Sequence, residues 1–389
     1  MNWHFANTLG LLLPHHLTRQ VRELYLATVL QNLALAMLLL FEPIYLWQQG
    51  FSVSQILWFF LAIYVIYLFT VPLGAKFATI QGFEKSIAIS TIAQIAYYAA
   101  LYLVAWSWWW AVPAVLLYTL QKMFYWPAWH ADFARYSDLT EEGKEVSALH
   151  VTLSAVYIVG PLIGGALITY GSWLSMFIFG CLLILVSNWP LLRTREQFTP
   201  RNFPYGEAFK RLFARENWRS FIGYLGFGEE LILLVLWPVF IATVITQYVE
   251  IGALVAGSTL IMVLATLYVG KLSDEQNKHS LLRMATVLYV LTWLARLLIR
   301  SPFSVFMVDS SSRLTKNIVQ VPLHTLLYEK AKSHSVMDTV VAFEMALVVG
   351  KIVAAGLLIA IFSQVATLTV EWTVTWLVAA AMALLYLLI

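Results

Sequence analysis

Twelve runs of predominantly apolar residues follow one another along the chain, and each has the length of about 20 residues that a helix needs to cross a bilayer. Only 12% of the 389 residues are charged and 61% are hydrophobic, whereas a soluble domain has about 25% charged residues. We therefore predict an all-α polytopic membrane protein with twelve transmembrane helices in the lipid bilayer. The predicted spans are residues 22–47, 53–77, 85–106, 111–133, 145–170, 172–192, 218–242, 250–271, 280–299, 303–328, 337–363 and 369–388.

The connections between these spans differ in charge on the two sides of the membrane. Those after the first, third, fifth and seventh spans contain almost no Lys or Arg, and most of the 24 basic residues lie on the other side. Basic residues mark the cytoplasmic side, so we expect both termini in the cytoplasm and the chain in the cytoplasmic (plasma) membrane. The net charge of +3 predicts no nucleic-acid partner, and the single cysteine, Cys181, excludes a disulfide within the chain.

The spans divide into two halves of six, because the longest connection is charged and lies in the middle. We expect an N-terminal bundle at residues 1–192, a cytoplasmic linker with an amphipathic helix at 193–217, and a C-terminal bundle at 218–389. Landmark residues of the first half return in the second after a nearly constant interval, which indicates duplication. These landmarks are Pro43 with Pro238 and Pro127 with Pro322, both 195 positions apart, and Gly74 with Gly270, 196 apart.

Three short motifs make a family resemblance specific. The fifth span contains Gly160-Pro161-Leu-Ile-Gly164-Gly165, the loop after the eighth contains Gly270-Lys-Leu-Ser-Asp274, and the fourth ends with Asp132 and Arg135. This pattern resembles the major facilitator superfamily over essentially the whole chain, and it implies gating roles for these residues and for Gly74. The first-half copy of the loop departs from the family pattern with Ala78 in place of an acid, which suggests an asymmetric gate. The fourth span has Val115 where many proton-coupled drug exporters have arginine, which argues against drug–proton antiport.

The resemblance implies that the first, fourth, seventh and tenth helices line a central cavity, and polar residues are concentrated in these same spans. Buried polar groups within a membrane are costly and mark substrate or ion pathways. The candidate substrate-binding residues are Gln31, Asn32, Gln121, Lys122, Arg313, Lys316, Asn317 and Gln320. The candidate coupling or ion-pair residues are Glu229, Glu230, Asp309, Glu344 and Lys351.

The tenth span carries the strongest of these signals. Its polar residues fall within an arc of about 100° on one face of a helix, and they are Asp309, Arg313, Lys316, Asn317, Gln320 and His324. Arg313 and Lys316 are the expected contacts for an anionic group of a substrate. The duplication places Lys122 of the fourth span beside their position in the other half.

Each of these charges also has a purely structural interpretation. Asp309 and Arg313 are spaced for an intrahelical ion pair, and Lys122 and Lys316 could join the two halves as struts to Glu229 and Glu230. Glu344 and Lys351 share a face that suits inner packing. Glu42 precedes a proline near the outer end of its helix and is expected at a rim or gate. Arg296 lies near a span end, where its side chain could extend to the surface.

These features predict a secondary active or facilitative transporter that moves a small polar organic solute, anionic or zwitterionic, by alternating access. It would act as a symporter or antiporter if protons couple transport, with Glu229 or Glu230 as the proton-linked group, and we expect a monomer. The alternatives are a lipid, lysolipid or amphipathic-drug flippase or exporter of the same fold and, from another class, a receptor or a membrane enzyme. The sequence contains no catalytic motif, no metal-ligand spacing and no cofactor-binding loop, so we expect no enzyme, metal or cofactor.

Overall fold

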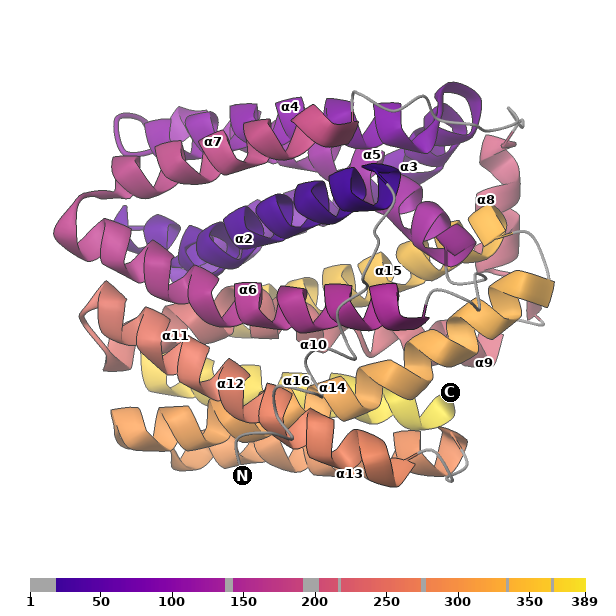
Figure 1. The fold of residues 1–389 in the computed structure, drawn as a ribbon. Helices are drawn as coiled ribbons and strands as arrows, with labels where there is room; N and C mark the ends of the chain where they lie inside the picture. The colour runs from indigo at the N-terminus through magenta and orange to yellow at the C-terminus, as the bar shows by residue number, and fades with distance from the viewer. Residues whose placement is uncertain are drawn as a thin grey trace, which may run out of the picture.

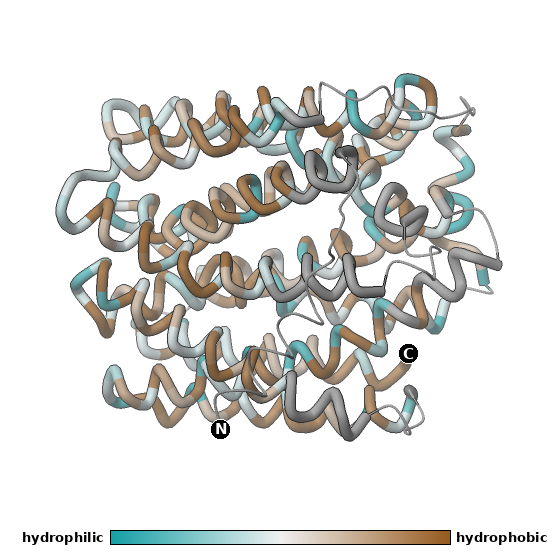
Figure 2. Tube along the Cα trace, in the orientation of Figure 1, coloured by the Kyte–Doolittle hydropathy of each residue, from teal (hydrophilic) through white to brown (hydrophobic). Residues whose placement is uncertain are grey.

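All regular elements of the described residues are helices that run side by side (Figure 1). The computed structural model describes residues 19–136, 143–191, 203–215, 218–273, 278–333, 336–364 and 367–389. Within these ranges, nine helices are long and apolar enough to cross a membrane. Hydrophobic residues prevail along the helices (Figure 2). The all-helical membrane class is confirmed, whereas the number of twelve spans stays a prediction.

The first six predicted spans correspond to six long helices. They are α2 (Arg19–Gln48), α3 (Val53–Gln81), α4 (Phe83–Leu103), α5 (Ala111–Tyr136), α6 (Gly143–Tyr170) and α7 (Trp173–Leu191), with a short 3-10 turn, η1 (Trp108–Trp110), before α5. Most of their packing is internal, with α4 and α3 against α5, and α2 between α6 and α7. The nine apolar helices do not include α5 and α7, because the first carries more polar residues and the apolar part of the second is short.

The second six predicted spans are less regular. Their elements are α9 (Trp218–Leu225), α10 (Gly228–Leu231), the π-helical η3 (Ile232–Leu236), α11 (Trp237–Val244), α12 (Tyr248–Ser273), α13 (Lys278–Ala295), η4 (Arg296–Leu298), α14 (Pro302–Ser333), α15 (Val336–Phe362), α16 (Leu368–Leu384) and η5 (Leu385–Leu388). The polar helix α14 is also not among the nine apolar ones. It packs against α12, α13 and α15.

The seventh predicted span is broken into four pieces, α9, α10, η3 and α11, and its two glutamates lie in α10. The backbone tightens at its first break, where the amide of Glu229 donates to the carbonyl of Gly226 and that of Glu230 to Phe227, both at 3.0 Å. It then widens into the π-helical η3. A Cβ on Gly228 would lie 2.6 Å from the carbonyl oxygen of Gly350 on α15. A side chain there would push α10 away from α15, so glycine allows the approach that brings both glutamates to the centre.

Only part of the expected linker helix can be compared with the structure, because residues 192–202 and 216–217 lie outside the described ones. The described helix α8 spans Tyr205–Leu212 and buries Ala208 and Leu212 while Lys210 is exposed, as an amphipathic helix does. The ammonium of Lys210 donates a 2.9 Å hydrogen bond to the exposed Glu207, and this bond lowers the pKa of that carboxyl. Arg211 forms a 2.9 Å ion pair with Asp338 of α15.

Helices of the two halves meet most extensively where α6 packs against α12 and α3 against α15. In the first contact, glycines replace side chains at the points of closest approach. A Cβ on Gly165 would lie 2.3 Å from the carbonyl oxygen of Tyr248, and one on Gly252 would lie 2.2 Å from that of Pro161. The amide of Val249 also donates to the hydroxyl of Thr169 at 3.1 Å. The two halves therefore come together here backbone against backbone.

This contact makes a direct prediction for two glycines that both lie inside helices. Gly252→Ala should lower the melting temperature of the purified protein in detergent, because the new methyl group meets the backbone of α6. Gly356→Ala on α15 is the matched control, since a Cβ there would meet nothing within 4 Å. Alanine stabilises a helix by about 0.5–1 kcal/mol over glycine, so the control should melt at the same temperature or higher. Equal melting temperatures of the two variants would contradict the close contact.

Candidate functional site

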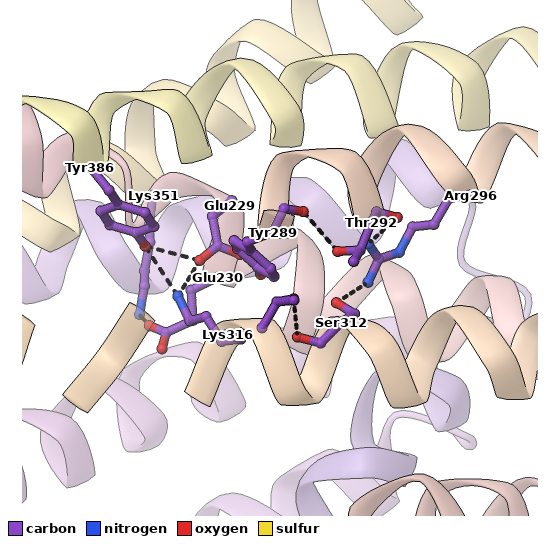
Figure 3. A network of polar contacts seen from close by, with 10 residues as sticks. Glu229, Glu230, Tyr289, Thr292, Arg296, Ser312, Lys316, Lys351 and Tyr386 are labelled. Carbon is purple, nitrogen blue, oxygen red and sulfur yellow. Dashed lines mark hydrogen bonds and ion pairs between the residues drawn. The ribbon is translucent and has the colours of Figure 1, made fainter. Parts of the chain in front are cut away.

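A buried ion pair between Glu229 and Lys316 lies at the centre of the described C-terminal half (Figure 3). Glu229, from the broken seventh span, is fully buried. Its Oε1 accepts hydrogen bonds from the Lys316 ammonium and from the Tyr386 hydroxyl, the latter at 2.9 Å. Its Oε2 accepts a 2.5 Å bond from Tyr289. Both oxygens are thus used, as a buried carboxylate requires.

Aromatic rings enclose the cation of this pair. The Lys316 ammonium lies 5.0 Å from the ring centre of Phe227, 5.1 Å from Tyr386 and 5.5 Å from Tyr289, and it also donates to the Tyr386 hydroxyl at 3.1 Å. Cation–π contacts stabilise an ammonium that has lost its water. Lys316 therefore has little capacity left for a substrate.

The second glutamate, Glu230, pairs with a different lysine, Lys351 of α15, at 2.7 Å. The side chain of Glu230 is 21% exposed, whereas that of Lys351 is 9% exposed. Lys351 also lies 5.3 Å from the ring centre of Tyr64 on α3. Neither Glu229 nor Glu230 is bound by Lys122, so both ion pairs lie within the C-terminal half and are not struts between the halves.

Contacts that do join the halves converge on Glu344 of α15. Its Oε1 lies 3.0 Å from Nε2 of His130 on α5, and its Oε2 accepts a 3.1 Å hydrogen bond from Tyr67 on α3. Glu344 and His130 are both buried. Glu344 thus connects to the N-terminal half, while its expected neighbour on the same face, Lys351, connects to Glu230.

Asp309 and Arg313 form the intrahelical ion pair that their spacing permits, with Nε of Arg313 2.6 Å from Oδ2 of Asp309. Asp309 is fully buried and its Oδ1 accepts a 2.8 Å bond from the Trp237 indole. The Arg313 side chain is 30% exposed, and its described contact uses Nε alone. Its two terminal amino groups therefore remain available for a ligand.

The expectation that Arg296 extends to the surface is wrong. It is 2% exposed, and its guanidinium lies 3.7 Å and 4.4 Å from the rings of Trp293 and Trp237. It donates to the hydroxyl of Ser312 at 3.0 Å and to the carbonyl of Thr292 at 3.3 Å (Figure 3). Stacking on tryptophan and hydrogen bonding offset the loss of water that a buried cation suffers.

The N-terminal half presents a different arrangement around Lys122 of α5. Its ammonium lies 4.4 Å from the ring centre of Tyr118 and 5.7 Å from that of Tyr64. Its described contacts are thus with aromatic rings and not with a carboxylate at ion-pair distance. Glu42 of α2 is 1% exposed, so it is buried and does not lie at an exposed rim.

The remaining candidate substrate contacts are spread over several helices. Gln31 and Gln121 are buried, and Nε2 of Gln31 has no partner among the described residues. Asn32 connects α2 to α6, because its Oδ1 accepts a 2.7 Å bond from Tyr157. Asn317 donates to Thr266 of α12 at 2.9 Å. Gln320 is half-buried on α14.

The glycines expected to act in gating lie at close helix contacts. Beyond Gly165, a Cβ on Gly160 would lie 2.5 Å from the Cβ of Ala36, one on Gly164 would lie 2.9 Å from the carbonyl oxygen of Met37, and one on Gly74 would lie 1.9 Å from that of Met123. Pro161 provides the carbonyl that faces Gly252. Asp274 lies outside the described residues, as do the surroundings of Asp132, Arg135 and Gly270 on their helices.

The residues that the sequence analysis missed include Tyr289 and Tyr386, and it did not predict that Arg296 is buried. All three come from the ninth and twelfth spans, which are not among the four spans expected to line the cavity. A tyrosine in a mostly apolar span is compatible with a lipid-facing or a buried location, so only the charge of Arg296 could have indicated a buried partner.

Charged residues buried between apolar helices, some on a discontinuous helix, define a polytopic membrane protein of the carrier type. The family model described as Major Facilitator Superfamily matches residues 24–336, and the chain therefore belongs to this superfamily of membrane transporters. The fold is also similar to the crystal structure of the nucleoside transporter NupG, with a TM-score of 0.68 at 11% sequence identity, covering 95% of this chain and 98% of that one. No curated protein matches the sequence significantly.

The buried pair leads to a stability prediction. Lys316→Met should destabilise the protein by about 3–5 kcal/mol, because it leaves Glu229 buried without its cation. Thermal unfolding in detergent measures the loss. The double variant Lys316→Met/Glu229→Gln should recover most of it, since no charge then remains buried.

Lys210→Met provides the control, because that lysine has a side chain 77% exposed and pairs only at the surface. Its melting temperature should equal that of the wild type. If the Lys316→Met protein is as stable as this control, the ion pair between Glu229 and Lys316 does not stabilise the fold.

Proposed function

We propose that this protein is a secondary carrier in the cytoplasmic membrane that moves a small anionic or zwitterionic organic solute by alternating access. The single observation that supports this most is the difference between the buried lysines. Lys316 and Lys351 are neutralised by Glu229 and Glu230, whereas Lys122 contacts aromatic rings. A cation within the membrane that lacks a carboxylate partner favours an anion as ligand.

One anion-binding group comes from each half in this proposal. Lys122 provides the contact from α5, and the terminal amino groups of Arg313 provide it from α14. The interval of 195 positions makes Tyr118, whose ring lies below the Lys122 ammonium, the counterpart of Arg313. A ligand held by both halves has a different affinity for the two arrangements of those halves, and such a difference is what drives a conformational change.

The contacts that would alternate can also be named. The contact of His130 with Glu344 and the hydrogen bond from Tyr67 to Glu344 join α5 and α3 to α15. A movement of one half relative to the other would either break both contacts or carry these three helices along together. At the glycines of α6 and α12, the two backbones are in direct contact. This contact could therefore act as the pivot about which the two halves rotate. We propose a monomer with both termini in the cytoplasm, acting without catalysis.

A screen for thermal stabilisation tests the substrate class. The panel contains glutamate, lactate, glucose 6-phosphate, uridine, glucose and a lysophospholipid, each added to the purified protein in detergent. We expect an anionic or zwitterionic member to raise the melting temperature. Stabilisation by uridine or glucose alone would contradict an anionic substrate, and stabilisation by the lysolipid alone would favour a flippase or exporter of amphipathic molecules.

Variants then test the contacts. Lys122→Gln should weaken binding of the stabilising anion at least tenfold, because a charge-assisted contact is worth about 1.5–3 kcal/mol. Lys210→Gln is the matched control on the exposed helix α8 and should bind as the wild type does. Unchanged affinity of Lys122→Gln would remove Lys122 from the binding site.

A further inference from the structure

Glu42 differs from the other buried acids described in the structure. Glu229 accepts three hydrogen bonds, Glu230 pairs with Lys351, Asp309 binds Trp237 and Arg313, and Glu344 binds His130 and Tyr67. Neither carboxylate oxygen of Glu42 has a hydrogen-bond partner among the described residues, although the side chain is 1% exposed.

The groups around Glu42 also have unused hydrogen-bonding capacity. On α4, the hydroxyls of Tyr97 and Tyr98 and Oε1 of Gln94 are buried and have no partner among the described residues. The rings of Tyr97 and Tyr98 lie 4.9 Å apart, and Tyr97 stacks on Tyr118 of α5 at 4.3 Å. Tyrosine side chains from α4 and α5 thus lie near the Glu42 carboxyl group without satisfying it.

The ionisable groups that interact with Glu42 include one cation. Tyr97 and Lys122 interact with it most closely, and Tyr98, Tyr118 and Tyr64 from α4, α5 and α3 also face it. From α7, Cys181 faces Tyr98. The other elements that pack on α2 are α6, η3 and α11, and their described residues contribute no ionisable group to these interactions.

An ionised carboxylate in such surroundings needs a cation in contact, because a buried charge without one is strongly disfavoured. A protonated carboxyl is neutral and avoids that cost. Lys122 is not in contact in this conformation, since its ammonium lies over the rings of Tyr118 and Tyr64. Its flexible stem of four carbons could bring it to Glu42.

We propose that Glu42 is a proton-binding site whose occupancy is controlled by the position of Lys122. When Glu42 binds a proton, Lys122 is released toward the solute. When Glu42 loses the proton to water, the carboxylate draws Lys122 back and the solute loses its cation. Protonation therefore strengthens anion binding and, by reciprocity, anion binding strengthens protonation, which couples movement of a proton and an anion in the same direction. This coupling rests on the proposed function, whereas the proton site does not.

This assignment differs from the expectation that Glu229 or Glu230 is the proton-linked group. Each of these two already has a lysine in contact, and Glu229 accepts hydrogen bonds from two tyrosine hydroxyls in addition. Glu42 has no lysine at ion-pair distance, and the nearby Tyr97 hydroxyl makes no hydrogen bond of good geometry with it.

Infrared spectroscopy of the full-length protein in lipid detects this proton without any substrate, because a neutral carboxyl has a C=O stretching band that a carboxylate lacks. We expect the band in the wild type at neutral pH and its loss in Glu42→Gln. Glu371→Gln makes the same chemical change on α16, outside the site, and should keep the band. If Glu42→Gln does not fold, Glu42→Asp, which retains a carboxyl group, replaces it in assigning the band to residue 42.

The variant Lys122→Gln tests whether Lys122 governs the protonation of Glu42. Without that cation the carboxylate is disfavoured further, so the Glu42 band should persist to a roughly tenfold lower proton concentration than in the wild type. A carboxylate signal for Glu42 at neutral pH, or the same titration in Lys122→Gln and wild type, would overturn the proposal. If the band behaves as expected but no anion of the panel binds, the proton site stands and the proposed substrate class fails.

Discussion

The cost of placing a charge in a medium without water governs the arrangement of this protein. Glu229 meets that cost in full, with a lysine and two tyrosine hydroxyls on its two oxygens. Four elements must be correctly placed for Glu229 to make these contacts, because the interacting residues come from the broken seventh span, α13, α14 and η5. The pair therefore fixes the packing of the C-terminal bundle as much as it serves any ligand. Removing the lysine leaves Glu229 buried without a cation in contact.

The two halves use charge differently although they derive from a similar pattern. In the C-terminal half, Glu229, Glu230 and Asp309 each have a base in contact, and Arg296, which has no acid in contact, is stacked on tryptophan and hydrogen-bonded to Ser312. In the N-terminal half, Lys122 and Glu42 lie near each other and are not in contact. A matched half is rigid, whereas a half with unmatched charges can respond to an added ion or proton.

Glycine decides where the helices can come close enough for these contacts. Gly228 of α10 faces the backbone of Gly350, and Gly350 of α15 faces the backbone of Leu225 in α9, so no side chain separates these segments. Glu229 and Glu230 lie about 100° apart around the helix and bind different lysines. Gly165 and Gly252 allow α6 and α12 of the two halves to meet in the same way. In the membrane such contacts depend on packing, since lipid supplies no hydrophobic force between helices.

Much of the fold could be predicted from the sequence, since a run of about 20 apolar residues can only satisfy its backbone in lipid as a helix. The polar stripe of α14 and the pairing of Asp309 with Arg313 also follow from helical spacing alone. What the sequence could not determine is which helices meet. The partners of Lys316 are 87 residues before it and 70 residues after it, and Lys351, seven residues from Glu344, binds Glu230 instead. Tertiary packing decided which acids have a cation in contact and left Glu42 without one, because contact between distant helices depends on their approach and rotation and not on local periodicity.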